Sequence, residues 1–269
     1  MLSYQHAYHA GGPADVHKHI VLAELLARLT EKPRGLSYVE THAGRGLYDL
    51  AAPEAAKTGE AAAGIGRLAP DAGTSFGRAL AAARAGGGAT AYPGSPFVAR
   101  ALLRRQDRMT LMELHPAEHA ALARALGGAS AAIHHRDGFE GALALAPFSP
   151  RRGLVLVDPS YEVKSDYAAA AAFVRRLVAR WPEAAVLVWY PILPAARHRA
   201  LRDGLAALPT AFDEAAFTSP PARGMTGSGL ALVNAPWGSE AAFAAARAQA
   251  AGVLEHAGLH TGLRPGEVP

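Results

Sequence analysis

The sequence contains no cysteine among its 269 residues. This absence excludes a disulfide framework, a thiolate zinc site, an iron–sulfur cluster and a cysteine nucleophile. The chain also has no apolar run of about 18 residues, and its first residues, MLSYQHAYHAGG, lack the apolar core of a signal peptide. We therefore expect a cytoplasmic protein with no membrane partner.

Lysine is scarce, and Lys18, Lys32, Lys57 and Lys164 are the only four against 23 arginines. With 23 acidic residues the formal net charge is +4. Arginine forks suit RNA phosphates, but a biased genome rich in Ala, Arg and Gly codons would produce the same balance. The charge permits a nucleic-acid partner without requiring one.

Short apolar segments alternate with helical patterns along most of the chain. A helix is expected from Pro13 to Lys32, another begins at Ser95, and two strands at 211–218 and 228–235 look like an antiparallel pair. Such alternation predicts a mostly parallel sheet with helices on both faces. The other strands are expected at 36–41, 108–113, 131–135, 153–157 and 184–190, and the other helices at 116–126, 138–145, 167–180 and 195–206.

Residues 47–94 interrupt this rhythm, because they are rich in Ala and Gly, hold helical patches and show no strand signal. In dinucleotide-binding folds an acidic residue follows the first glycine turn by about 20 residues. Here Glu113 lies 73 residues beyond Glu40. We therefore predict a single domain over 1–269 with an inserted helical sub-domain at 47–94.

Three strand ends carry residues suited to a nucleoside ligand, since ligands of such sheets lie beyond the carboxyl ends of the strands. The run Glu40-Thr41-His42-Ala43-Gly44-Arg45-Gly46, with small residues after the strand, forms either a plain turn or a binding loop. Glu113 is either a solvated acid or an acceptor for ribose hydroxyls. Asp137-Gly138 lies at the next strand end, but such a turn is too common to indicate a nucleoside site by itself.

The most specific motif is Asp158-Pro159-Ser160-Tyr161, directly after the buried strand GLVLV. It is either an ordinary turn or a site for methylating an exocyclic amino group. Such a nitrogen is a poor nucleophile, and hydrogen bonds to Asp158 and the Pro159 carbonyl would accept its developing positive charge. Tyr161 would stack on the flipped base.

The chain resembles the RlmJ-type 23S rRNA adenine-N6 methyltransferases over essentially its full length. The resemblance rests on the N-terminal run Met1-Leu2-Ser3-Tyr4 to Lys18-His19 and on motifs in the family's order. These motifs are THAGRG at 41–46, YPGSP at 92–96, ELHP at 113–116, DGF at 137–139, WYP at 189–191 and RGMTGSG at 223–229.

The resemblance implies a Rossmann-like class I fold, S-adenosylmethionine as cofactor, and 23S rRNA, free or in an early assembly particle, as substrate of a monomer. Asp158 is implied as the catalytic residue. Substrate contacts are implied for Tyr4, His6 and Lys18, beside Pro159 and Tyr161 from the motif. The implied cofactor-binding positions are His19, His42, Ser95, Glu113, Asp137, Gly138 and Asp158.

One position departs from the family's Asp-Pro-Pro-Tyr motif, because Ser160 replaces the second proline. A proline there would hold the preceding residue in extended geometry. The serine keeps open a non-catalytic RNA-binding protein with a degenerate methyltransferase fold. DNA adenine-N6 methylation is the alternative within the enzyme class, because the same chemistry serves both polymers.

The N-terminal histidines raise a different reading, a metal-dependent hydrolase. On a helix, however, His17 and His19 lie about 200° apart and do not share a face. We therefore expect no metal.

Overall fold

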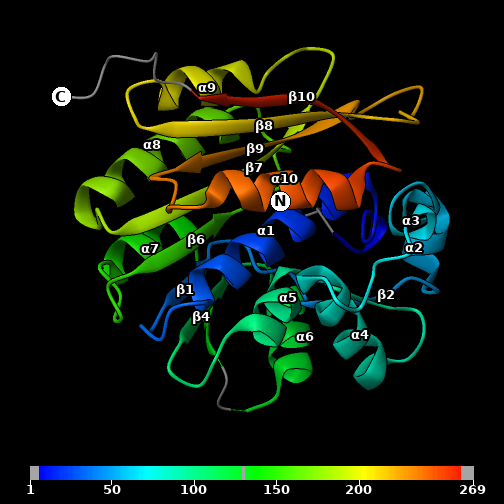
Figure 1. Ribbon diagram of the computed structural model, residues 1–269, viewed down its shortest axis with the longest axis horizontal. Coiled ribbons are helices and arrows are strands. Elements are labelled where there is room, and N and C mark those ends of the chain that lie inside the picture. The colour runs from blue at the N-terminus through cyan, green and yellow to red at the C-terminus, as the bar shows by residue number, and fades with distance from the viewer. Residues whose placement is uncertain (1–5, 129–130, 262–269) are drawn as a thin grey trace.

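The structure, a computed structural model, describes residues 6–128 and 131–261 and is built on a sheet of order β10-β8-β9-β7-β6-β1-β4-β5 (Figure 1). The strands from β7 to β5 are parallel, and β9, β8 and β10 continue the sheet antiparallel. The strands are β1 Ser37–Glu40, β4 Arg108–Glu113, β5 Ala132–His135, β6 Gly153–Val157, β7 Ala184–Ile192, β8 Thr210–Phe217, β9 Gly227–Val233 and β10 Leu254–Thr261.

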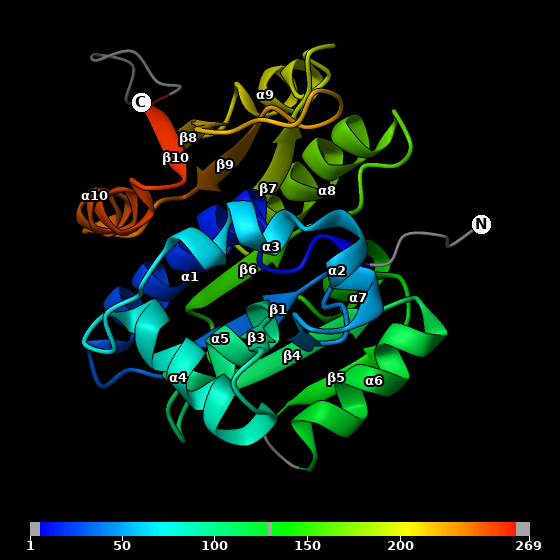
Figure 2. The ribbon, with the colours of Figure 1, turned by 90° about the vertical axis from the view of Figure 1, so that its right-hand side faces the viewer.

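Helices cover both faces of this sheet, which confirms the predicted Rossmann-like arrangement (Figure 2). α1 and α10 lie on one face, and α7 and α8 lie on the other. The helices of the main body are α1 Pro13–Thr30, α5 Ser95–Leu102, α6 Pro116–Leu126, α7 Gly138–Leu145, α8 Asp166–Arg180, α9 Arg199–Leu205 and α10 Ser239–Ala250, preceded by a 3-10 turn, η1 His6–Tyr8.

Helix α1 is buried on nearly all sides, because α10 packs over it while it packs on the sheet. Gly12 caps its N-terminus, and Pro13 occupies the first turn, where a missing N–H costs nothing. The burial explains the broad apolar face of this segment and also encloses Asp15, His17, Lys18 and His19.

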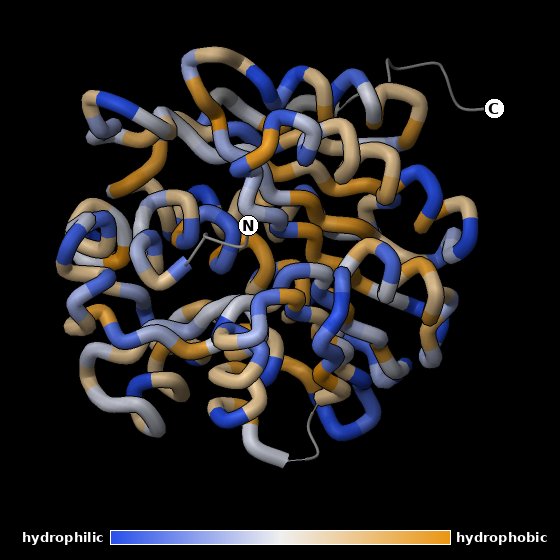
Figure 3. The backbone as a smooth tube through the Cα atoms, turned by 180° about the vertical axis from the view of Figure 1, so that it is seen from behind, coloured by the Kyte–Doolittle hydropathy of each residue, from blue (hydrophilic) through white to orange (hydrophobic). Residues whose placement is uncertain are grey.

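Apolar segments gather through the middle of the molecule, and hydrophilic segments form the outer loops (Figure 3). Every residue of β6 is buried, as expected for a central parallel strand covered on both faces. Within the described residues, no helix has the length and apolarity needed to cross a membrane.

The prediction that 47–94 contains no strand was wrong. β2 Leu47–Asp49 and β3 Ala91–Pro93 pair antiparallel at the two ends of this segment. Each has only three residues, too few for a period-2 pattern to stand out in the sequence. Between them lie α2 Pro53–Thr58, α3 Glu60–Ala63, η2 Ile65–Arg67 and α4 Ser75–Gly87. Treating 47–94 as a sub-domain stays a prediction.

The C-terminal part also differs from expectation. The antiparallel pair is confirmed as β8 and β9, but α10 and the edge strand β10 were not predicted. The alanine-rich sequence of α10 shows little contrast between its faces, and β10 pairs with β8 across a register shift between His256 and Leu259.

We expect Gly153→Ala to lower the free energy of unfolding by about 1–3 kcal/mol, because overpacking forces neighbours to shift. A Cβ at this position in β6 would lie 2.2 Å from Cζ2 of the buried Trp181. Gly86→Ala, at an open position in α4, is the control and should stabilise by about 0.4–1 kcal/mol. Denaturant unfolding measures both, and equal stabilities would contradict the packing account.

Candidate active site

The candidate site lies where the chain changes direction across the sheet, since β1 has β4 on one side and β6 on the other. The carboxyl ends of these strands border a cleft with an empty volume of about 890 Å³, part of it open to solvent. Its position is the one where such folds bind ligands. From the sequence-predicted set, the cleft is lined by His6, Lys18, His19, His42, Ser95, Glu113, Asp158 and Pro159.

The glycine turn after β1 is held by Glu113. Its Oε2 accepts a hydrogen bond from the Gly44 N–H at 2.8 Å, and its Oε1 accepts one from the His115 N–H at 2.7 Å. Gly44 has φ of +61°, and a Cβ there would lie 2.6 Å from the Tyr48 hydroxyl. The positive φ and this contact both favour glycine at position 44, and the turn lines the cleft beside the Glu113 carboxylate.

Asp137 and Gly138 lie next to this turn without lining the cleft. Asp137 caps α7 by accepting a hydrogen bond from the Glu140 N–H at 2.9 Å. A Cβ on Gly138 would lie 1.8 Å from the Thr41 carbonyl oxygen, so the two loops touch there. The Phe139 ring meets His42 edge to face at 5.2 Å. Burial lowers the pKa of His42, so this ring is neutral at neutral pH.

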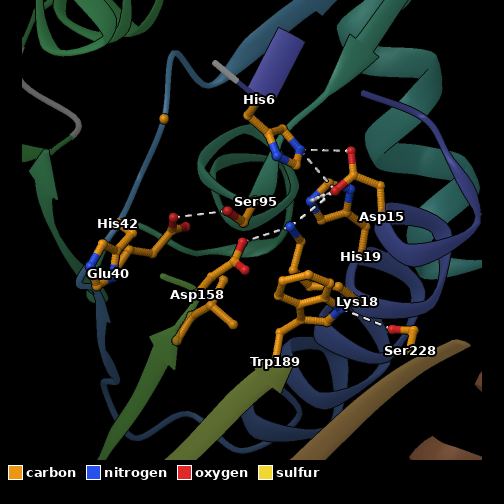
Figure 4. A network of polar contacts seen from close by, with 12 residues as sticks. His6, Asp15, Lys18, His19, Glu40, His42, Ser95, Asp158, Trp189 and Ser228 are labelled. Atoms are coloured by element: carbon orange, nitrogen blue, oxygen red, sulfur yellow. Dashed lines mark hydrogen bonds and ion pairs between the residues drawn. The ribbon is translucent and has the colours of Figure 1, made fainter. Parts of the chain in front are cut away.

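Lys18 joins α1 to the end of β6 (Figure 4). Its Nζ donates to Asp158 Oδ2 at 2.6 Å and lies 3.0 Å from Asp15 Oδ1. Burial alone would lower the pKa of this ammonium, but the two carboxylates more than offset burial and raise it. Within the described residues no hydrogen bond reaches Oδ1 of Asp158, so this oxygen can accept one from a substrate.

Two histidines flank the same carboxylate, Asp15. His6 Nε2 lies 2.9 Å from both Asp15 oxygens, and His19 Nε2 lies 4.0 Å from Oδ1. The other His19 nitrogen, Nδ1, pairs with the Tyr92 hydroxyl at 2.9 Å. Burial lowers the pKa of His19 to about 3, so its ring is neutral. Tyr4 lies outside the described residues.

Ser95 meets a buried acid that the sequence analysis did not place in the site. The Ser95 hydroxyl donates to Glu40 Oε2 at 2.8 Å, and the Tyr38 hydroxyl donates to Oε1 at 2.5 Å. Burial raises the pKa of Glu40 to about 8. Glu40 closes β1, and its position as an acid at a buried strand end was the only available signal.

The loop after β6 directs its side chains differently from expectation. Pro159 and Ser160 line the cleft, whereas the Tyr161 side chain points inward. The Tyr161 hydroxyl donates to the Trp189 carbonyl at 2.6 Å, its ring packs on Tyr167, and its φ is +54°. Stacking of Tyr161 on a substrate stays a prediction, and it requires this loop to change conformation.

Comparison with known proteins gives one consistent answer. The family model described as ribosomal RNA large subunit methyltransferase D, RlmJ, matches residues 33–261. The chain belongs to this family. Curated relatives named ribosomal RNA large subunit methyltransferase J include one from Haemophilus influenzae, 37% identical over 248 residues, and one from Escherichia coli, 36% identical over 247 residues. Each alignment covers 88% of this chain and 88% of the relative.

A solved structure supports the same fold. A crystal structure of a Legionella pneumophila protein matches 95% of this chain and 99% of its own, with a TM-score of 0.81 and 30% identity. The RlmJ family resemblance proposed from the motifs is therefore confirmed.

His17 and His19 of this RlmJ family member point to different sites, as the helical spacing predicts. His19 faces the cleft, while His17 Nε2 lies 3.2 Å from Asp213 Oδ2. His17, Asp213 and His256 are close enough to share an ion. Arg247, however, donates to Asp213 Oδ1 at 2.9 Å, and its fixed positive charge opposes a cation there.

We expect Glu40→Gln to remove a pH dependence of stability. With a folded-state pKa of about 8 against an ordinary 4.5, the folded protein binds this proton more tightly than the unfolded chain. This group's contribution to the free energy of unfolding therefore falls as pH rises from about 4.5 to about 8. Glutamine stays neutral, so the variant should gain stability relative to the unmodified protein over that window.

Denaturant unfolding between about pH 5 and pH 9 measures this difference. Glu240→Gln, at an exposed position on α10, is the matched control. Parallel stability curves for the unmodified protein and Glu40→Gln would show that Glu40 ionises normally in the folded state.

Proposed function

We propose that this chain transfers a methyl group from S-adenosylmethionine to the N6 amino group of an adenine in 23S rRNA. The observation that carries the proposal is Asp158, which closes the buried strand β6 in the cleft with one oxygen held by Lys18. Membership of the RlmJ family and the names of the relatives support rRNA as the substrate class.

The residues present fit the cofactor. The glycine turn at Gly44 and the Glu113 carboxylate that holds it line the cleft, and a carboxylate at this strand end suits ribose hydroxyls. The neutral His42 ring also lines the cleft and would border the cofactor's base, with the turn at Asp137-Gly138 packed behind it. When bound there, S-adenosylmethionine supplies an electrophilic sulfonium methyl group.

The chain's own residues would prepare the amino nitrogen for attack. The adenine N–H groups would donate to Asp158 Oδ1 and to the Pro159 carbonyl, drawing the nitrogen lone pair out of conjugation with the ring. The carboxylate then stabilises the positive charge that develops on the nitrogen. Lys18 fixes the rotamer of Asp158 through Oδ2 at 2.6 Å, so Oδ1 is presented without reorganisation.

The balance of charges around Lys18 suits this chemistry. Asp15 and Asp158 carry two negative charges against one ammonium, and His19 is neutral, so these four residues are net negative. A negative site favours a cationic cofactor and a cationic transition state. Without Asp15, the ammonium would cancel the charge of Asp158 just where positive charge develops.

The deciding experiment is radiolabelled methyl transfer to rRNA from a strain lacking this protein, followed by nucleoside analysis. N6-methyladenosine formed in 23S rRNA supports the proposal. Methyl transfer to DNA but not to rRNA would show that DNA is the substrate. Binding of rRNA without methyl transfer to any adenine would favour a non-catalytic RNA-binding protein, the alternative suggested by Ser160.

We expect Asp158→Asn to reduce methyl transfer by at least about 10²-fold, because the amide keeps the size but loses the negative charge. RNA affinity should change little, since most contacts to RNA are made to phosphates. Single-turnover transfer and filter binding separate the two effects. A variant that transfers at the unmodified rate would remove Asp158 from the chemistry.

We expect Glu113→Gln to weaken S-adenosylmethionine binding by about 1.5–3 kcal/mol, the range for hydrogen bonds to a charged group. Glutamine keeps one acceptor oxygen for the Gly44 N–H but loses the one for the His115 N–H, so thermal unfolding must show that the variant is folded. Calorimetry on the folded variant provides the measurement. Unchanged affinity would place the ribose elsewhere.

A further inference from the structure

A group of basic side chains lies far from the cleft, at the opposite ends of the parallel strands. We name this surface the amino edge and define it by Lys32, Arg34, Arg105, Arg108, Arg152 and Trp237. The loop that follows α1, in blue at the lower left of Figure 1, belongs to it.

The topology brings these residues together from four loops. Lys32 and Arg34 precede β1, Arg105 and Arg108 flank the start of β4, and Arg152 precedes β6. Trp237 follows β9, whose end pairs with the start of β7 because the two strands are antiparallel. All four loops therefore emerge at the amino ends of the parallel strands.

Hydrogen bonds make the surface continuous. The Arg104 guanidinium donates to the carbonyls of Lys32 at 2.6 Å and Arg34 at 2.8 Å while pairing with Asp107. Arg104, Arg105 and Arg108 line one open groove. Arg152 donates to the Leu29 carbonyl at the end of α1. Arg104 thus links the loop before β1 to the groove at β4.

The charge here is not neutralised. Within the described residues, none of the five basic members takes part in an ion pair. Burial, then the charges of Arg34 and Arg104, lower the pKa of the Arg152 guanidinium. Crowding of like charges costs folding stability, and a polyanion bound here would relieve it.

An exposed tryptophan adds a second kind of contact. The Trp237 side chain is 80% exposed, with the Arg28 guanidinium 4.4 Å and the Lys32 ammonium 6.0 Å from its ring centroid. Most of the ring nevertheless remains open to solvent. Basic side chains around an exposed aromatic ring favour RNA, since phosphates pair with the former and an unpaired base stacks on the latter.

We infer that the amino edge is a second RNA-binding surface, which holds a segment of the substrate rRNA distinct from the one that carries the target adenine. The inference rests on the proposed function for the identity of the RNA. The strands β1, β4 and β6, which run between the cleft and this edge, have four to six residues and span roughly 13–20 Å, a distance that a large folded RNA bridges easily.

The inserted segment does not compete for this role. Between residues 49 and 94 four acids balance four bases, so the segment has no net charge. A phosphate backbone gains little there. Counterions released by phosphates that pair with the amino edge would contribute to binding there.

The test compares two triple variants with equal charge change. The edge variant is Arg34→Gln, Arg105→Gln and Arg108→Gln, and the control variant is Arg78→Gln, Arg84→Gln and Arg199→Gln; all six residues are exposed. The probe is unmodified full-length 23S rRNA, with the dissociation constant measured against salt concentration. S-adenosylmethionine binding and thermal unfolding report whether each variant is folded.

We expect the edge variant to bind the rRNA at least tenfold more weakly at low salt. The slope of log affinity against log salt concentration should become shallower by about two to three, because three fewer charges pair with phosphates. The control variant should bind as the unmodified protein does. Trp237→Ala should weaken binding by about tenfold without changing the salt dependence, because stacking is not ionic.

The inference is overturned if the edge variant binds 23S rRNA with the affinity and salt dependence of the unmodified protein. This includes the case in which the amino edge binds heparin or an acidic peptide but does not contribute to rRNA binding. An edge-dependent interaction with rRNA by a protein that transfers no methyl group supports the inference and fails the proposed function. If the unmodified protein transfers the methyl group but the edge variant binds rRNA as tightly as the unmodified protein does, the proposed function is supported and the inference is overturned.

Discussion

A buried ammonium between two carboxylates holds the active end of this protein together. Lys18 lies on α1, Asp15 one turn before it, and Asp158 at the end of the central strand β6. Leaving any one of these charges alone in an apolar interior would be costly, because an unpaired buried charge has lost its hydration. The first turns of α1 and the end of β6 are therefore fixed relative to each other by charge as well as by packing.

The same contact explains why α1 is so deeply enclosed. A surface lysine would be hydrated and mobile, and would hold a carboxylate only weakly. The Lys18 side chain is buried at the wall of the cleft, and its ammonium lies 5.5 Å from the centre of the Trp189 ring. Helix α10 packs against α1 as well and helps to hold this helix in place.

The sequence predicted the parallel sheet and the paired strands β8 and β9, and eight of the twelve residues predicted for the site line the cleft. The strands, and the strand-end acids Glu113 and Asp158, follow from local pattern, a buried run such as GLVLV with a polar residue directly after it. The other site residues, such as Lys18 and Ser95, came from the resemblance to the family. Glu40 was missed as a site residue because its importance comes from Tyr38 and Ser95, and Ser95 lies 55 residues away. The inward direction of Tyr161 was unpredictable for the same reason, since its partner is a carbonyl on β7. β2, β3 and β10 depend on pairing partners rather than on their own sequence.

The two ends of the parallel strands have opposite electrostatic character, and this difference is a consequence of what each end must do. At the carboxyl ends, the charges of Asp15, Lys18 and Asp158 are arranged to be net negative, which favours cations and repels phosphates. An enzyme that acts on RNA with such a site cannot obtain its RNA affinity from the site itself. The affinity has to come from elsewhere on the surface, and uncompensated basic residues such as Arg105 and Arg108 lie at the far ends of the same strands. With phosphate binding at the amino edge, the cleft can keep the net negative charge that favours methyl transfer. The basic residues that bind phosphates are then too far away to cancel that charge.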